Sequence, residues 1–305
     1  MTTVQNRARR AQPPARPAAK PRTEPFAVVS LVCVSLFAVF ALVPLWMIVA
    51  GSFTDESKLS VDGYSLWPKP FSTAAYQAIF AGGTLWKALF ASLFITIVGT
   101  ALALAATAGL AWVIARRIPR LSTALAVFGY VPMLFTGGLV PLYILVTQYL
   151  RLTDSWFAVI LPGAVAPFLV FIAVSFFAQL PKEILDSARV DGAGELRTFF
   201  QIVLPLSKPI LAVVGLFYAV HFWNEWFMAL LFISDPNKFP VQLVLQNLIA
   251  SVANAANMAP VSSNVAPVYQ LRLALTVVTI LPILFAYPFA QRYFVKGLTL
   301  GATKG

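Results

Sequence analysis

The sequence predicts an all-α membrane protein with six transmembrane helices. Apolar residues make up 59% of its 305 residues and charged residues only 11%, whereas soluble proteins carry about 25% charged residues to cover their surface. Six apolar stretches are long enough to cross a hydrocarbon core of about 30 Å, which takes about 20 helical residues. Basic residues gather between these stretches mainly on one side, as in multi-pass membrane proteins.

Residues 1–25 precede the first apolar stretch and are predicted to form a disordered, basic cytoplasmic tail. They are rich in proline, alanine and arginine and contain one acid, Glu24, a composition that cannot bury a core. The apolar stretch that follows is too long for a signal peptide and has no convincing small-residue cleavage site. We therefore expect an uncleaved first helix and a transmembrane domain over residues 26–305.

The six predicted spans are 26–50, 87–115, 121–148, 156–179, 208–233 and 272–295. The third is the least regular, because Pro132, Gly137, Gly138 and Pro141 interrupt it. Broken helices persist in membranes only where protein or a cavity satisfies the freed backbone groups. This span is therefore expected to pack inside the bundle rather than against lipid.

The distribution of basic residues predicts that both termini are cytoplasmic. With that orientation, sixteen Lys and Arg residues fall inside and six fall outside, as the positive-inside rule requires. The net charge of +11 is thus explained by topology and does not indicate nucleic acid. Two long loops, 51–86 and 234–271, are then external, and either is long enough to meet a partner or to serve as a connector.

A cytoplasmic segment over residues 181–207 separates the fourth and fifth spans and is amphipathic. Pro181 opens a first short helix with Glu183 in its first turn. Gly192 and Gly194 then interrupt the helix, and a second one is expected over Glu195–Val203, ending before Pro205.

Each of these two helices has an apolar side. The first carries Ile184, Leu185 and Ala188, and the second carries an i, i+3, i+4, i+7 stripe of Leu196, Phe199, Phe200 and Val203. Such a helix–Gly–helix segment can sit in another protein's groove. It can equally pack on its own bundle or on the headgroups, and the pattern alone leaves both readings open.

The same segment resembles the cytoplasmic signature of ABC importer permeases, E-A-A-x3-G-x9-I-x-L-P. Here it reads Asp186-Ser187-Ala188, three residues, Gly192, nine residues, then Ile202-Val203-Leu204-Pro205. All spacings match, and the two departures, Asp186 for Glu and Ser187 for Ala, keep an acid and a small residue. The end of the chain, 291–305, looks like the carbohydrate-uptake subgroup, and 135–141 looks like the subgroup for aldouronate and complex polysaccharides.

The resemblance implies the type I ABC importer permease fold, in which this segment is a coupling helix that docks into a separate ATPase subunit. It implies as partners a second homologous permease, a cytoplasmic ATPase dimer, an extracytoplasmic sugar-binding protein and a sugar or oligosaccharide, at the bacterial plasma membrane. The coupling residues that it implies are Glu183, Asp186, Ser187, Ala188, Asp191, Gly192, Ile202, Leu204 and Pro205. The sequence has no G-x-x-x-x-G-K-[ST] phosphate loop, so we expect no bound cofactor, and ATP is used by the partner subunits.

The fifth span carries the candidate substrate-pathway residues, all within one run: Tyr218, His221, Trp223, Asn224 and Glu225. Glu225 is the one acid placed within a span, and intramembrane ionisable residues are functional candidates. Aromatic, amide and carboxylate groups suit sugars, which stack and hydrogen-bond. In the alternative reading the tryptophans are interfacial anchors and Glu225 pairs with a helix-end donor or with the partner permease.

Two other classes compete with the importer reading. An ion-gradient-driven secondary transporter or a channel would carry several buried acids, and often inverted repeats, but the spans hold one acid and no evident repeat. An enzyme is not indicated, because the chain has a single His and no H-E-x-x-H, which leaves no metal site of that kind.

Overall fold

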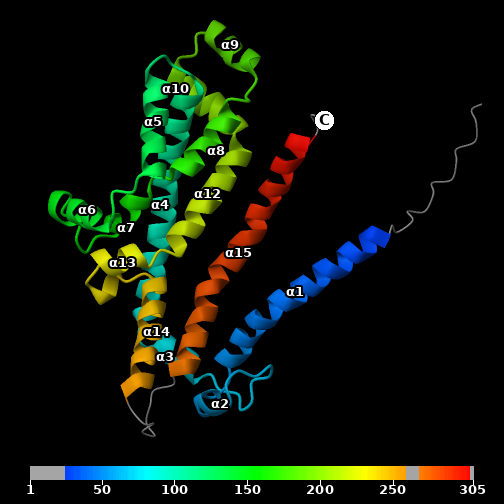
Figure 1. Ribbon diagram of the computed structural model, residues 1–305, viewed down its shortest axis with the longest axis vertical. Helices are drawn as coiled ribbons and strands as arrows, with labels where there is room; N and C mark the ends of the chain where they lie inside the picture. The colour runs from blue at the N-terminus through cyan, green and yellow to red at the C-terminus, as the bar shows by residue number, and fades with distance from the viewer. Residues whose placement is uncertain (1–24, 259–267, 303–305) are drawn as a thin grey trace, which may run out of the picture. The chain divides into compact units, whose positions relative to one another are not determined.

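The computed structural model describes residues 25–258 and 268–302, with side chains over 26–251 and 268–285 (Figure 1). Except for Pro25, the tail predicted for residues 1–25 lies outside the described residues, as do the side chains of the last residues of the chain. The chain divides between Trp46 and Met47 into two units. The first contains most of the first helix, and the second contains all the other elements.

All the regular elements found in the described ranges are helical. They are α1 (Pro25–Ser52), α2 (Glu56–Asp62), α3 (Ala74–Ala81), α4 (Thr84–Ala115), α5 (Leu121–Leu134), α6 (Leu139–Ile144), η1 (Leu145–Tyr149), α7 (Trp156–Ile160), η2 (Leu161–Gly163), α8 (Pro167–Phe177), α9 (Lys182–Val190), α10 (Glu195–Thr198), η3 (Phe199–Val203), α11 (Leu204–Leu206), α12 (Lys208–Trp223), α13 (Phe227–Phe232), η4 (Pro236–Lys238), α14 (Val241–Met258) and α15 (Val268–Ala302).

Membrane spans of two kinds are found in the described part of the chain. Three continuous helices are long and apolar enough to cross a membrane: Phe26–Ser52, Thr84–Ala115 and Val268–Phe285. Three further pairs of helices qualify only if each bent pair counts as one span: Leu121–Leu134 with Leu139–Tyr149, Trp156–Gly163 with Pro167–Phe177, and Glu195–Leu206 with Lys208–Trp223. The total of six agrees with the sequence prediction.

The third span is broken where its prolines and glycines predicted. Its halves meet at 118°, and Gly138 takes a φ of +86° before α6 begins, a conformation that costs a residue with a Cβ more. The expectation that this span packs inside the bundle is met only in part. Most of its side chains are exposed, Phe128 and Leu134 among them, whereas Val146 in its second half is buried against Ala158 and Phe232.

The predicted fifth span, 208–233, is not one helix. α12 ends at Trp223, and the short α13 follows after a break at Asn224–Trp226. Asn224 ends α12 because its side-chain amide donates to the carbonyl of Val220 at 2.8 Å, as asparagine does where it competes with helix continuation. The sixth span begins earlier than predicted, at Val268 rather than 272.

The loop predicted over 234–271 contains a long helix, α14, which the sequence analysis missed. Its apolar residues recur at helical spacing and pack on the ends of α4 and α15, with Val241 and Leu245 buried and Val244, Leu248 and Ile249 partly buried. That i, i+4, i+7, i+8 spacing was the signal available.

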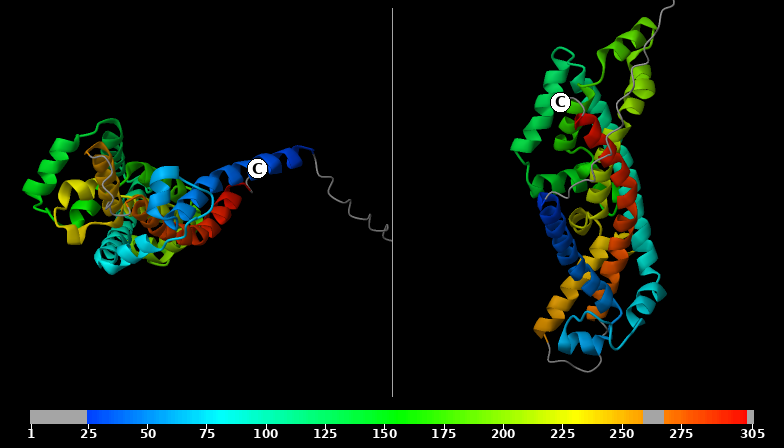
Figure 2. Two further views of the ribbon diagram at one scale, coloured as in Figure 1. Left: turned by 90° about the horizontal axis from the view of Figure 1, so that it is seen from below. Right: turned by 90° about the vertical axis from the view of Figure 1, so that its right-hand side faces the viewer.

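The core of the second unit lies where α4 packs against α12 and α8, which Figures 1 and 2 show running side by side. Gly99 lets α4 and α12 approach closely, because a Cβ at this position would lie 2.9 Å from the ring of Phe222. Ile95, Val214 and Phe222 are almost completely buried in this contact. On its outer side α4 exposes Trp86, Phe90, Leu93 and Ile97, a face suited to lipid or to a partner helix.

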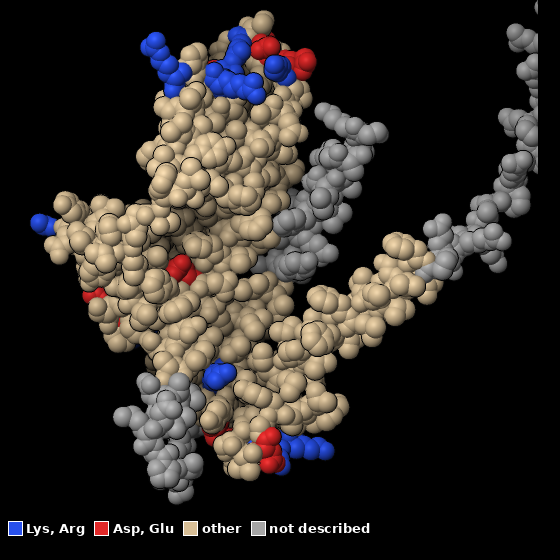
Figure 3. Space-filling view, in the orientation of Figure 1, with Lys and Arg blue, Asp and Glu red and all other residues tan. Residues whose placement is uncertain are grey.

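Charged side chains are rare along the apolar spans. On the face shown in Figure 3, Lys and Arg gather over the end that carries α9 and α10, and the middle is almost wholly uncharged. This separation matches a chain whose middle lies in hydrocarbon.

Candidate functional site

The segment over residues 181–207, which we call the coupling segment, contains the two short helices that the sequence predicted. α9 begins after Pro181, and it ends at Val190 because Gly192 takes a φ of +77°, in the left-handed region. The N–H of Ala193 bonds to the carbonyl of Ala188 at 2.9 Å and closes this turn. Gly194 has an ordinary φ of −69° and serves as the N-cap of α10.

The second helix of the coupling segment is longer than predicted. It was expected to end before Pro205 but continues to Leu206. A π-helical turn over Phe199–Val203 makes this possible, because its wider hydrogen bonds, such as Leu204 N–H to Phe199 C=O, bypass the N–H that Pro205 lacks. The chain then turns by 82° at Ser207 into α12.

The apolar stripes of the coupling segment divide between two environments. Ala188 and Val203 are buried, and Phe199 packs on Trp112 of α4 at 6.2 Å between ring centroids. Val190 and Leu196 point outward, 87% and 76% exposed. Each reading that the sequence left open thus fits part of the segment: one side packs on its own bundle, and the other is free to meet another protein.

Ion pairs fix the coupling segment to the end of α4. Arg116, the residue after α4, lies 2.5 Å from the carboxylate of Glu195 and stacks on Trp112 at 5.3 Å from the ring centroid. Arg189 of α9 pairs with Asp186 at 3.1 Å and approaches Glu195 at 3.8 Å. Two arginines and two acids therefore join α4, α9 and α10.

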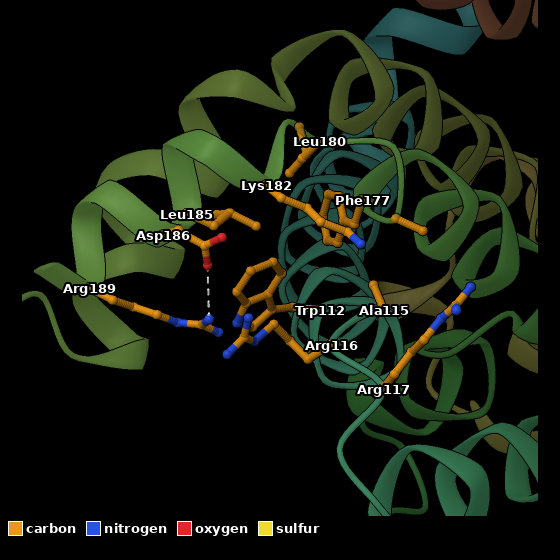
Figure 4. Close-up of a pocket in the computed structure, with 11 residues that line it drawn as sticks. Trp112, Ala115, Arg116, Arg117, Phe177, Leu180, Lys182, Leu185, Asp186 and Arg189 are labelled. Carbon is orange, nitrogen blue, oxygen red and sulfur yellow. Dashed lines mark hydrogen bonds and ion pairs between the residues drawn. The ribbon is translucent and has the colours of Figure 1, made fainter.

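A cavity of about 450 Å³ lies between the end of α4 and α9 (Figure 4). Its lining contains Trp112, Phe177 and Leu185 together with the charged residues Arg116, Arg117, Lys182, Asp186 and Arg189. The lining therefore combines apolar side chains with a surplus of basic ones.

The remaining coupling residues named from the sequence have simple roles within this chain. Glu183, Asp186, Asp191 and Pro205 are exposed, and Ile202 and Leu204 are half-buried. The hydroxyl of Ser187 donates to the carbonyl of Ile184 at 3.0 Å, and Asp191 ends α9. The acids are thus exposed to a partner, whereas the side chain of Ala188 is buried within this chain.

Tyr218 of the fifth span is buried and holds a helix break together. Its hydroxyl accepts a hydrogen bond from the N–H of Ala166 at 2.9 Å and lies 2.6 Å from the hydroxyl of Thr107. Ala166 directly precedes Pro167, where η2 and α8 meet at 51°. Tyr218 thereby satisfies a backbone group that the break leaves without a helical partner.

Trp223 and Asn224 also make contacts within the chain. The indole of Trp223 is buried and donates to the carbonyl of Thr279 at 3.2 Å, which ties α12 to α15. The carbonyl of the exposed Asn224 side chain accepts from Gln242 of α14 at 3.2 Å.

Glu225 and His221 meet at the end of α12. Glu225 follows the end of α12, so it does not lie on the helix that carries Tyr218 and His221. One of its carboxylate oxygens accepts from the N–H of Met228 at 2.9 Å, and the other lies 3.9 Å from Nε2 of His221. The pairing of Glu225 with a helix-end donor, an alternative kept open from the sequence, is present.

A second cavity, of about 510 Å³, lies beside His221. It is formed by the break before α8 and by the facing side of α12, with Gly163, Phe168, Phe217, Tyr218 and His221 in its wall. A Cβ on Gly163 would come within 2.8 Å of His221 Nε2, so a larger residue at this position would displace the imidazole. Among the described residues, no group of three His, Cys, Asp or Glu side chains could hold a metal ion.

Comparison with known protein families identifies the chain. The model for the family described as "Binding-protein-dependent transport system inner membrane component" matches residues 103–300, which include the coupling segment and the break after α12. The chain belongs to this family.

Relatives of this inner membrane component cover almost its whole length. Protein LplC of Bacillus subtilis (strain 168) is 42% identical over 265 residues, which are 87% of this chain and 90% of that protein. The polygalacturonan/rhamnogalacturonan transport system permease protein YtcP of the same organism is 36% identical over 272 residues, 88% of this chain and 95% of that protein.

A solved structure shows the same fold. A chain of a bacterial ABC transporter involved in the import of the acidic polysaccharide alginate superposes with a TM-score of 0.76 at 24% identity, over 92% of this inner membrane component and all of that chain. The fold expected from the signature at Asp186–Pro205 is thereby confirmed.

Proposed function

We propose that this chain is a permease subunit of an ATP-driven importer that carries a sugar or oligosaccharide across the bacterial plasma membrane. Its partners are a second permease, a cytoplasmic ATPase dimer that grips the coupling segment, and an extracytoplasmic sugar-binding protein. The chain itself binds no ATP, and both of its termini lie in the cytoplasm.

The observation that carries the proposal is the divided surface of the coupling segment. One side is fixed to α4 by Arg116–Glu195 and by Val203, and the other exposes Val190, Leu196 and Phe200 with the acids of α9. Isolated exposed apolar residues are ordinary, but a cluster rimmed by charges marks a protein contact. A segment held rigidly on one side and gripped on the other transmits a displacement to the spans.

The proposed cargo follows from the relatives and from the cavity beside His221. Relatives are named for polygalacturonan/rhamnogalacturonan and for arabinooligosaccharide transport. In this chain the cavity offers the exposed rings of Phe168 and Phe217 for stacking on a sugar and the half-exposed imidazole of His221 for a hydroxyl group. Glu225 orients that imidazole, and the partner permease closes the open side.

Co-purification with the ATPase and substrate-stimulated ATP hydrolysis in vesicles test the proposal. Val190→Ser and Leu196→Ser remove the two most exposed apolar side chains of the coupling segment, so both should weaken ATPase retention and stimulation. Val61→Ser, at an equally exposed apolar residue of α2, is the matched control and should change neither. Normal stimulation in the first two variants would reject the docking role.

A further inference from the structure

We propose that the cavity between the end of α4 and α9 binds the phosphate group of an anionic phospholipid from the cytoplasmic leaflet. The inference rests on the proposed function for one point, that the coupling segment lies on the cytoplasmic side. It adds a lipid site to the segment that the ATPase grips.

The charges around this cavity are not balanced. Asp186 compensates Arg189, and Glu195 compensates Arg116. Lys182 also lines the cavity and has no acidic partner among the described residues. A cavity that keeps a free ammonium group attracts an anion.

A second cationic group of the lining also has no acid beside it. Arg117 lines the cavity, is exposed and makes no ion pair among the described residues. A phosphate oxygen is a good acceptor for a guanidinium N–H.

Figure 4 shows how the cationic groups lie. The side chains of Arg116 and Arg189 reach toward each other below Asp186, and Arg117 extends away from them. The cationic groups left for an anion are therefore Lys182 and Arg117. This set suits a single phosphate diester.

The apolar part of the lining favours a lipid over a soluble anion. It consists of Trp112, Phe177, Leu180 and Leu185, and the cavity lies where α4 and α8 end. Tryptophan at a helix end is typical of the headgroup level, and basic cavities between spans at the cytoplasmic surface bind anionic headgroups. A phospholipid can contact the basic residues with its phosphate and the apolar residues with its acyl chains, whereas inorganic phosphate can contact only the basic residues.

Native mass spectrometry of the complete transporter in detergent tests this site directly. Phosphatidylglycerol is titrated into the wild type, into Lys182→Gln and into Lys208→Gln. Lys208 is the matched control, because it is also an exposed lysine that begins a helix of the same end but does not line the cavity. Removing one cationic contact should weaken phosphatidylglycerol retention about fivefold in Lys182→Gln and leave it unchanged in Lys208→Gln.

Further arms identify the source of the phosphate. Phosphatidylcholine, whose phosphate is neutralised by choline, should be retained poorly by all three proteins, and excess inorganic phosphate should not displace phosphatidylglycerol. The site is overturned if Lys182→Gln retains as much phosphatidylglycerol as the wild type. It is also overturned if Lys208→Gln loses as much phosphatidylglycerol as Lys182→Gln. Displacement by inorganic phosphate overturns the lipid as its ligand.

These readouts do not depend on ATP. Substrate-stimulated hydrolysis is measured separately on the wild type. A wild type that retains phosphatidylglycerol but shows no stimulation would reject the proposed transport function and leave the lipid site standing. The reverse result would reject only the lipid site.

Discussion

Arg116 and Glu195 join the second span to the coupling segment through a 2.5 Å contact between guanidinium and carboxylate. Arg116 is the first residue after α4, and Glu195 is the first residue of α10, so the pair links two helix ends. The ring of Trp112 packs against the guanidinium, which restricts the orientation of the Arg116 side chain toward Glu195. The pair connects the coupling segment, which we propose that a partner grips, to the helix α4, which is long and apolar enough to cross the membrane.

Glu195→Gln should separate stability from coupling. The Glu195 side chain is 61% exposed, and pairs with such exposure stabilise proteins by less than about 1 kcal/mol, so thermal unfolding should hardly change. Transport per ATP hydrolysed should fall roughly two- to tenfold, because the link between segment and span is weakened. Transport and ATP hydrolysis are both measured in reconstituted vesicles.

The double variant Arg116→Gln with Glu195→Gln provides the control for this pair. If the two residues act through each other, the double variant should lose no more coupling than Glu195→Gln alone. Additive losses would mean that each residue acts through a different contact.

Gly192→Ala should impair coupling through backbone conformation alone. A Cβ at Gly192 would meet nothing within 4 Å, but φ is +77°, and a residue with a Cβ pays about 1–2 kcal/mol in this region. The turn between α9 and α10 should open, so substrate-stimulated ATP hydrolysis falls while membrane insertion is preserved.

The neighbouring glycine is the matched control. Gly194 is equally unobstructed but has a φ of −69°, so Gly194→Ala should behave like the wild type. Equal effects of the two substitutions would show that loop flexibility, and not the left-handed turn, is what matters.

These two glycines also show how far sequence reasoning reaches. Their spacing predicted the break between α9 and α10, and Pro132, Gly137, Gly138 and Pro141 predicted the broken third span. The helix-breaking pattern alone could not tell which glycine carries the turn, because either can end a helix. The signature's one glycine falls at Gly192, and the positive φ at Gly192 agrees with it.

Other features depend on contacts that a linear pattern does not contain. The π-helical turn before Pro205 departs from the 3.6-residue period on which the stripe Leu196–Val203 was drawn, and Phe199 packs on Trp112 whereas Phe200 is exposed. Tyr218 looked like a pathway residue because it lies near His221, but its partner Ala166 is 52 positions away. Such distant pairings follow from packing.

Tyr218→Phe should destabilise the fourth span. The substitution keeps the ring in its buried site but leaves the N–H of Ala166 without its acceptor, which costs about 1–3 kcal/mol for a buried group. We expect a lower unfolding temperature in detergent. Tyr149→Phe, at an exposed tyrosine, should not change it, and an unchanged temperature in Tyr218→Phe would show that water replaces the hydroxyl.

Asp154 gives the chain a pH-dependent contact outside the spans. Its carboxylate accepts from the N–H groups of Asp235 and Ser234 at 2.9 and 2.6 Å, and these two bonds hold the pKa of Asp154 below its ordinary value of 3.8. A group with a lowered pKa stabilises the folded protein above the unfolded pKa and loses that contribution as pH falls through the folded pKa. Protonation below about pH 4 should therefore loosen the loop at Ser234.

Asp154→Asn isolates this effect, because Asn does not titrate and tolerates the positive φ of 56° at this position. Above pH 5 the wild type should unfold at a higher temperature than Asp154→Asn. The gap should close as the pH falls below about 4, where the protonated carboxyl resembles the amide. A gap that stays constant or widens in acid would mean that the ionised carboxylate does not hold the loop at Ser234, and that the amide differs from it for steric reasons.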